Sequence, residues 1–98
     1  MTERSIDAIL LATNDNVICL LRDMTAGQRP AVDGANPPPL SQDTALGHKI
    51  AISFIERGTA VLKYGAVIGL ATKDIEPGEH VHLHNLAGLN QVKASMEC

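Results

Sequence analysis

Residues 73–79, KDIEPGE, show the local design that decides the fold of this chain. An apolar residue is followed by two variable residues, a glycine and a polar residue. The same design occurs in residues 22–28 (RDMTAGQ) and 53–59 (SFIERGT). Glycine adopts the positive φ angles of tight turns at little steric cost. Because each copy lies between two short apolar runs, the pattern predicts three tight connections in an all-β domain of short strands.

The apolar runs themselves favour strands over helices. They are short, rich in Val and Ile, and repeatedly interrupted by glycine. Residues 6–12 (IDAILLA) and 17–21 (VICLL) flank a cluster of turn residues at 13–16, which predicts a hairpin. Hydrophobic residues make up 45% of the chain but aromatic residues only 2%, so the core must be aliphatic.

The overall composition restricts the class of protein. A chain of 98 residues is long enough for one domain. Its net charge of −3 and its low aromatic content argue against a nucleic-acid partner, because phosphates require a basic surface and unpaired bases require aromatic platforms. No apolar run approaches the ~20 residues of a membrane helix, so no membrane partner is expected.

The first residues and the cysteines favour a soluble, cytoplasmic protein. The start, MTERS, lacks the basic and apolar regions of a signal peptide. Cys19 lies in an apolar run, as is typical of a core residue, and Cys98 is the last residue. Two such cysteines are not expected to form a disulfide framework, which favours a reducing cytoplasm.

Residues 29–43 (RPAVDGANPPPLSQD) form a Pro-rich loop, since they hold four of the five prolines and show no sustained periodicity. Connections of this length are often functional, and a mobile flap and a plain surface excursion are both consistent with the composition. Alternation is lost after residue 86. We therefore expect a β domain over residues 1–86 and a C-terminal tail over residues 87–98, with a short helix as an alternative for the tail.

Residues 79–86, EHVHLHNL, place three of the four histidines on alternate positions. Alternation is the period of a β-strand, so His80, His82 and His84 are expected to share one face. Same-face neighbours on a strand lie ~6.6 Å apart, and two imidazoles at this spacing can bind one divalent ion through metal–nitrogen bonds of ~2.1 Å. Binding of one ion by all three would need a bend or bulge.

This histidine face has several interpretations. His82 with His84 is the preferred metal-binding pair, and His80 with His82 is the alternative. Imidazole suits iron or zinc, whereas magnesium prefers oxygen ligands. The same rings could carry protons or bind a carboxylate, and they could also form only the solvated outer face of an edge strand.

Three further residues are candidates for catalysis. His48 follows Gly47, whose backbone freedom would let His48 face a cleft; a structural histidine is the alternative. Lys63 and Tyr64 could offer an ammonium and a phenol to a polyhydroxy acid, whose carboxylate requires a cation. A packing role is the alternative for Tyr64, which is one of only two aromatic residues.

Several ungapped motifs of this sequence resemble the small SAF-type, β-clip domain of the altronate/galactarate dehydratase family. They are GHKIA (47–51), VLKYGAVIGLATKDI (61–75) and GEHVHLHN (78–85), and residues 15–17 and the RDMTAG turn match the first half of that domain. The resemblance covers roughly residues 6–86. It implies a small all-β, β-clip fold with the Pro-rich loop as a departure from the compact family pattern.

The resemblance also implies a function. In this family the domain precedes a much larger catalytic region or forms a separate small subunit beside one. We therefore expect the small subunit, or N-terminal domain, of a lyase that dehydrates a sugar acid to a 2-keto-3-deoxy acid, as altronate dehydratase does. A large catalytic subunit is the expected partner, and the chain is not expected to be active alone. The divalent metal is expected to be Fe2+, with Mn2+, Zn2+ and Mg2+ as alternatives.

Two other functions remain open. One is the small subunit of a sulfolactate sulfo-lyase, which eliminates sulfite in place of water; the histidine-rich segment resembles the altronate and sulfolactate branches more than the galactarate branch. The other is a sugar-acid-binding or assembly module without chemistry of its own. Association of the chain with copies of itself is a further alternative.

Overall fold

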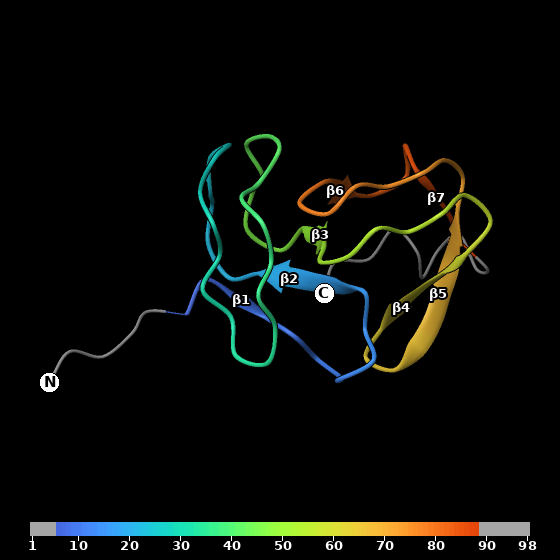
Figure 1. The fold of residues 1–98 in the computed structure, drawn as a ribbon, viewed down its shortest axis with the longest axis horizontal. Helices are drawn as coiled ribbons and strands as arrows, with labels where there is room; N and C mark the ends of the chain where they lie inside the picture. The colour runs from blue at the N-terminus through green and yellow to red at the C-terminus, as the bar shows by residue number, and fades with distance from the viewer. Residues whose placement is uncertain (1–5, 89–98) are drawn as a thin grey trace, which may run out of the picture.

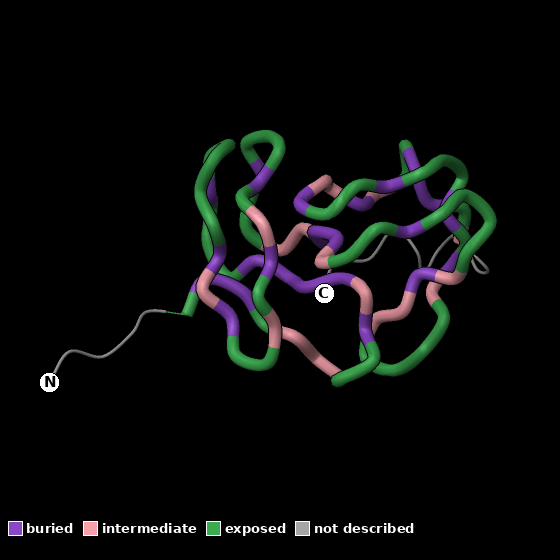
Figure 2. Tube along the Cα trace, viewed as in Figure 1, coloured by how far each residue is buried: buried purple, intermediate pink, exposed green. Residues whose placement is uncertain are grey.

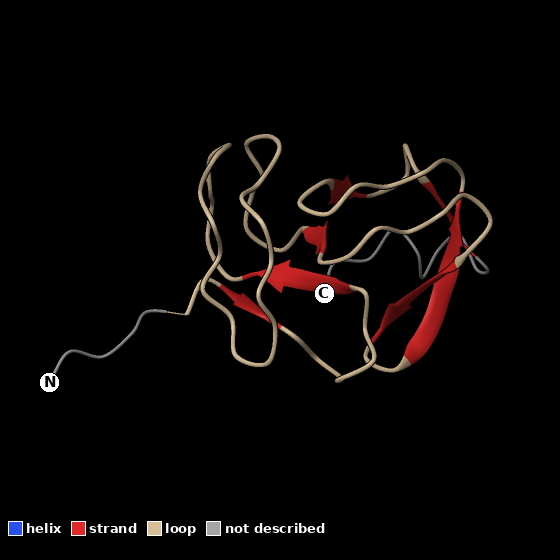
Figure 3. Ribbon diagram, viewed as in Figure 1, coloured by secondary structure: helices blue, strands red, loops and turns tan. Residues whose placement is uncertain are grey.

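The computed structural model describes residues 6–88, and residues 1–5 and 89–98 lie outside the described part. Within residues 6–88, short strands form two antiparallel sheets without any helix, so no helix there could cross a membrane (Figure 1, Figure 3). The predicted all-β class is thus confirmed. The strands are β1 (Ala8–Ile9), β2 (Val17–Leu20), β3 (Lys49–Ala51), β4 (Ala60–Lys63), β5 (Ala66–Ala71), β6 (His80–Val81) and β7 (Leu86–Gly88).

The strand order places β6 at the edge of one sheet. That sheet has the order β1-β2-β3-β6, and the other has the order β4-β5-β7. The predicted hairpin is β1–β2, in which Ala8 pairs with Leu20 and Ile9 with Cys19. Of the predicted C-terminal tail, Ala87 and Gly88 belong to β7, and residues 89–98 lie outside the described part.

Four turns of one design, rather than three, connect the strands of the described chain. Residues 43–47 (DTALG) join the three predicted copies, and the glycines of all four turns have φ angles between 87° and 90°. The turns meet in two pairs, because Met24 forms an antiparallel bridge with Thr44 and Ile55 forms one with Ile75. The sequence pattern does not reveal the fourth copy, because Thr44 occupies its apolar position.

In the first pair of turns, each turn is capped by a carboxylate of the other. Asp23 Oδ1 accepts a hydrogen bond from the Leu46 N–H at 2.8 Å. Asp43 Oδ1 accepts one from the Ala26 N–H at 2.9 Å. The exchange satisfies one backbone donor in each turn.

The second pair of turns contains only one such bond, in which Asp74 Oδ1 accepts from the Arg57 N–H at 2.9 Å. At the reciprocal position, Phe54 lies where an acceptor would be and Pro77 where the donor would be. Proline has no N–H. In the second pair of turns, the position without an acceptor (Phe54) is therefore the one that faces a residue without an N–H donor (Pro77).

Two apolar cores lie on opposite faces of the four-stranded sheet. Its central strands β2 and β3 are buried along their length (Figure 2). The register sets Val17 beside Ala51 and Ile18 beside Ile50, and successive residues of a strand face opposite sides. The core between the two sheets contains Val17, Ala51, Ile55, Val61, Ala71, Ile75, Val81 and Leu86. The core on the other face contains Ala8, Ile18, Leu20, Met24, Val32, Leu40 and Ile50.

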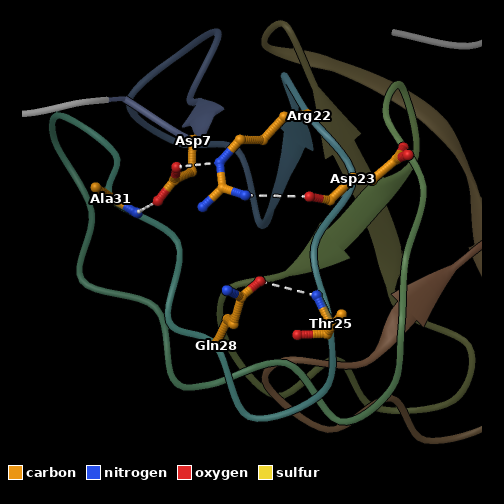
Figure 4. Close-up of polar contacts among 6 residues, drawn as sticks. All are labelled: Asp7, Arg22, Asp23, Thr25, Gln28 and Ala31. Atoms are coloured by element: carbon orange, nitrogen blue, oxygen red, sulfur yellow. Dashed lines mark hydrogen bonds and ion pairs between the residues drawn. The ribbon is translucent and has the colours of Figure 1, made fainter.

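The Pro-rich loop covers this second core. Val32 and Leu40 of the loop are buried in it. Asp7 ties the loop to the segment that follows β2, because its carboxylate accepts from the Ala31 N–H at 2.8 Å and from Arg22 Nε at 2.7 Å (Figure 4). The Ala31 N–H, followed by the Arg22 guanidinium, lowers the pKa of Asp7 below its ordinary value despite the opposing effect of burial.

Cys19 lies in β2 and is 2% exposed, as expected for a core residue. Cys98 lies outside the described residues.

Candidate metal centre

Cross-strand register brings the histidine that precedes β3 close to the two histidines at the end of β6. Lys49 pairs with Val81 and Ile50 with His80 in the antiparallel β3–β6 ladder. Extending this register by one residue places His48 opposite His82. Residues opposite one another in an antiparallel pair point to the same face and approach more closely than same-face residues along one strand. The strands β3 and β6 are neighbours in the sheet (Figure 1). Because His48 directly precedes β3 and His82 directly follows β6, the ends of these strands present three imidazoles on one face.

The three imidazoles form a compact group of ring nitrogens, which we call the histidine triad: His48, His80 and His82. One nitrogen of each lies within 4.8 Å of the other two. His48 Nδ1 and His80 Nε2 are 2.9 Å apart and share a hydrogen bond. The ring of His82 is 5.4 Å from that of His48 and 5.6 Å from that of His80, measured between centroids.

These separations fit a divalent metal ion. Metal–nitrogen bonds of ~2.1 Å place the nitrogens of a tetrahedral or octahedral site roughly 3–3.5 Å apart. His48 and His80 are already close to this spacing, with their nitrogens 2.9 Å apart, and the His82 nitrogen lies within 4.8 Å of both, so it would have to move closer to complete the site. Three protein ligands are also the number typical of catalytic zinc sites, which keep a position for water or substrate.

The protonation state of His80 and His82 suits metal binding. Burial, followed by the neighbouring His48, His84, His82 and Lys49, lowers the pKa of His80 from 6.5 to about 4. Burial, followed by Lys49 and His48, also lowers the pKa of His82. Both rings are thus neutral near pH 7, and neutral imidazole is the form that ligates metals.

His84 lies outside the triad. The expected strand ends at Val81, and residues 82–85 form a turn in which the Asn85 N–H donates to the His82 carbonyl at 3.0 Å. His84 is exposed on this turn, with its ring centroid 5.4 Å from that of His80. The structure therefore brings His80 and His82 together with His48, and it leaves the expected His82–His84 pair without a ring contact in the described chain.

Lys63 and Tyr64 lie at the β4–β5 hairpin, in the other sheet. Tyr64 is 74% exposed and has a φ of 58°, and the Asp15 carboxylate accepts hydrogen bonds from the N–H groups of Tyr64 and Gly65. Among residues 6–88, no hydrogen bond or ring contact joins Lys63 or Tyr64 to the triad. The structure does not assemble the two candidate groups with His48.

Two residues beside the triad were not among the predicted site residues. Lys49 is 3% exposed, and its charge is one cause of the lowered pKa values of His80 and His82. Asn85 is fully buried and hydrogen-bonds the backbones of both histidines. The position of Lys49 follows only from the β3–β6 register, whereas Asn85 carries a local signal as a turn-forming residue closing the histidine repeat.

Comparison with known proteins places this site in a family context. Residues 6–89 match the family model described as the altronate/galactarate dehydratase SAF domain. The chain is 46% identical to altronate dehydratase of Escherichia coli K12 over 71 residues, which are 72% of this chain and 14% of that protein. It is 40% identical to altronate dehydratase of Bacillus subtilis 168 over 77 residues, which are 79% of this chain and 15% of that protein.

A shorter relative also matches. The chain is 44% identical to (2R)-sulfolactate sulfo-lyase subunit alpha of Paracoccus pantotrophus over 43 residues, which are 44% of this chain and 64% of that protein. The chain thus spans about one seventh of the altronate dehydratases that it matches, and most of that length has no counterpart in it.

Proposed function

The chain belongs to the altronate/galactarate dehydratase SAF-domain family, and from this membership we propose that it supplies the metal-binding part of a sugar-acid hydro-lyase site. The observation that carries the proposal is the convergence of His48, His80 and His82 within 4.8 Å. The proposed reaction converts a 2,3-dihydroxy acid into a 2-keto-3-deoxy acid and water.

The chemistry supports a composite site. Elimination requires removal of the proton on the carbon next to the carboxylate and departure of the 3-hydroxyl group as water. It therefore needs a base, groups that bind the carboxylate, and an electrophile near the oxygens. Within residues 6–88, the triad is a candidate metal site, and its side-chain hydrogen bond, between His48 and His80, brings in no separate base. We assign the remaining groups to a larger catalytic polypeptide, which the much greater length of the altronate dehydratases supports.

The donor set favours a borderline metal. Three imidazole ligands suit Fe2+ or Zn2+, whereas Mg2+ prefers oxygen ligands and keeps much of its water. When bound, such an ion supplies Lewis acidity toward the oxygens of the substrate. In this chain, His48, His80 and His82 would hold the ion. The buried surroundings that lower the pKa of His80 would also limit access of water to one side of the site.

A second candidate function is supported by the match to sulfolactate sulfo-lyase subunit alpha. In that case the leaving group would be sulfite in place of water, while the metal-binding role of the triad would be unchanged. The two candidates differ in product, so one assay of the assembled enzyme separates them.

The test is reconstitution with a large catalytic polypeptide related to the part of altronate dehydratase that this chain does not match. We expect the complex to form a keto acid, or sulfite if the second candidate holds. Substitution of His48, His80 or His82 by Ala should lower turnover and metal content together, at least about 100-fold for turnover. The matched control is His84→Ala, because His84 is an exposed histidine outside the triad.

Assembly must be followed in parallel by gel filtration. Loss of turnover with assembly intact supports the proposed role of the triad. Full turnover by a variant lacking two triad histidines would contradict it, and would leave assembly as the role of the domain. Turnover by this chain alone, at the rate of the complex, would contradict the composite site.

A further inference from the structure

Asn85 is a buried polar residue in the turn that follows β6, next to the histidine triad. Its side chain is completely inaccessible to solvent. The side-chain Oδ1 accepts from the His82 N–H at 3.0 Å, and Nδ2 donates to the His80 carbonyl at 2.8 Å. One amide group therefore holds the backbone on both sides of Val81, at the two residues whose rings belong to the triad.

The backbone of Asn85 adds two further restraints. Its N–H donates to the His82 carbonyl at 3.0 Å, and its carbonyl accepts from the Thr72 N–H at 2.9 Å. Thr72 directly follows β5, so Asn85 links the turn after β6 to the second sheet. With its side chain and backbone both engaged, Asn85 has a single orientation available.

We infer that Asn85 is a positioning residue, which fixes His80 and His82 for metal binding without touching the metal. The inference rests on the metal site proposed above. The physical reason is the way in which the strand ends. If residues 82–84 continued β6, the backbones of His80 and His82 would keep the ordinary ~6.6 Å spacing of a strand, and only side-chain rotamers would orient the two rings. The Asn85 hydrogen bonds close a turn instead, and the two rings stack at 5.6 Å with an interplanar angle of 11°.

The fold offers a matched control in Asn16. Its Nδ2 donates to the Ala60 carbonyl at 3.0 Å, and its Oδ1 accepts from the Leu62 N–H at 2.8 Å. Asn16 thus makes the same two kinds of bond as Asn85, but to β4 and not to the triad. Substitution of either asparagine by Ala removes two side-chain hydrogen bonds to backbone, and only one substitution acts on the histidines.

The experiment measures binding of Co2+ and Zn2+ to the 98-residue chain at pH 7.5 and 10 °C. Calorimetry gives the affinity, the visible absorption of Co2+ reports ligand geometry, and circular dichroism verifies folding. We expect Asn85→Ala to weaken Co2+ binding about 10-fold or more and to change the Co2+ spectrum, as loss of an outer residue that orients ligands does in other metal sites. Asn16→Ala should bind within about 2-fold of the unsubstituted chain even where its melting temperature falls equally.

The outcomes separate the inference from the proposed function. Equal Co2+ affinity and spectrum in the Asn85 and Asn16 variants would overturn the positioning role while leaving the metal site in place. Absence of Co2+ and Zn2+ binding by the unsubstituted chain would overturn the metal site and the inference with it. If Asn85→Ala does not fold, Asn85→Ser is compared with Asn16→Ala in its place. The serine side chain is too short to bond both the His82 N–H and the His80 carbonyl.

Discussion

His48 Nδ1 lies 2.9 Å from His80 Nε2, although 32 positions separate the two residues in the chain. The contact exists because β3 and β6 are antiparallel neighbours in a register that sets Ile50 beside His80. Neighbouring strands lie closer together than same-face residues along one strand. Extending the register by one residue sets His48 opposite His82, so His48 reaches His80 diagonally across the ladder, where ring side chains are still within contact distance.

Stability of the metal-free protein should depend on pH through His80. Its pKa is lowered to about 4 in the folded chain, against an ordinary value of 6.5. The unfolded chain thus binds the proton more tightly, and the stabilisation is fully present above pH 6.5 and lost as the pH falls toward 4. We expect the free energy of unfolding to fall by about 2 kcal/mol over this window, after allowance for the partial exposure of the ring.

Urea unfolding in the presence of a chelator measures this pH dependence. His80→Asn is the control and should reduce the slope of the curve between pH 6.5 and 4, leaving the contribution of His82, whose pKa is also lowered by burial. Asp7 does not interfere, because its pKa is lowered from 3.8 and its contribution is lost only below that window. A curve of the unsubstituted chain that is flat between pH 4.5 and 7 would contradict the account of the buried ring.

The exchange of carboxylates between turns predicts a double-mutant result. Asp43→Ala should lower the free energy of unfolding by about 1 kcal/mol, because the Ala26 N–H loses its acceptor. Phe54→Asp alone should give no corresponding gain, because Pro77 offers no N–H. Combined with Pro77→Ala, the new Asp should gain about 0.5–1 kcal/mol of favourable coupling, measured by urea unfolding of the four proteins in the cycle. Zero coupling would contradict the proposed equivalence of the two turn pairs.

Gly27 and Gly78 have nearly the same backbone conformation, so substituting each by Ala tests how closely the Pro-rich loop packs against the turn at Gly78. Gly27 and Gly78 have φ angles of 89° and 90°, so Ala is strained at both by about 1–2 kcal/mol. A Cβ at Gly27 would meet nothing within 4 Å, whereas a Cβ at Gly78 would lie 2.5 Å from the Pro39 carbonyl oxygen. We expect Gly78→Ala to cost about 2 kcal/mol more than Gly27→Ala in thermal unfolding. Equal costs would show that the loop does not press on this turn.

The sequence specified the fold through local signals. The glycine turns, the β1–β2 hairpin and the aliphatic core follow from short-range chemistry, and the structure agrees with them. The sequence pattern did not predict the fourth turn, because its apolar position is occupied by Thr44, which forms the bridge with Met24. Local periodicity likewise could not show that Val32 and Leu40 of the Pro-rich loop are buried in the core.

The candidate site could be predicted only in part. Alternation correctly indicated that His80 and His82 share a face, because both positions lie on or next to β6. It could not indicate that the strand ends at Val81, since that depends on burial of the Asn85 side chain. Alternation also could not predict that His48 lies beside His80 and His82, because the register of β3 against β6 is set by tertiary packing.

The most direct test of the triad is the affinity of the 98-residue chain for Zn2+ at pH 7.5, compared among single histidine variants by calorimetry. We predict one ion per chain, a loss of about 100-fold or more for His48→Ala, His80→Ala and His82→Ala, and a change of less than about 3-fold for His84→Ala. If His84→Ala lost as much Zn2+ affinity as His80→Ala and His48→Ala lost none, the triad would be contradicted. The metal ligands would then be the histidines of residues 80–84 alone.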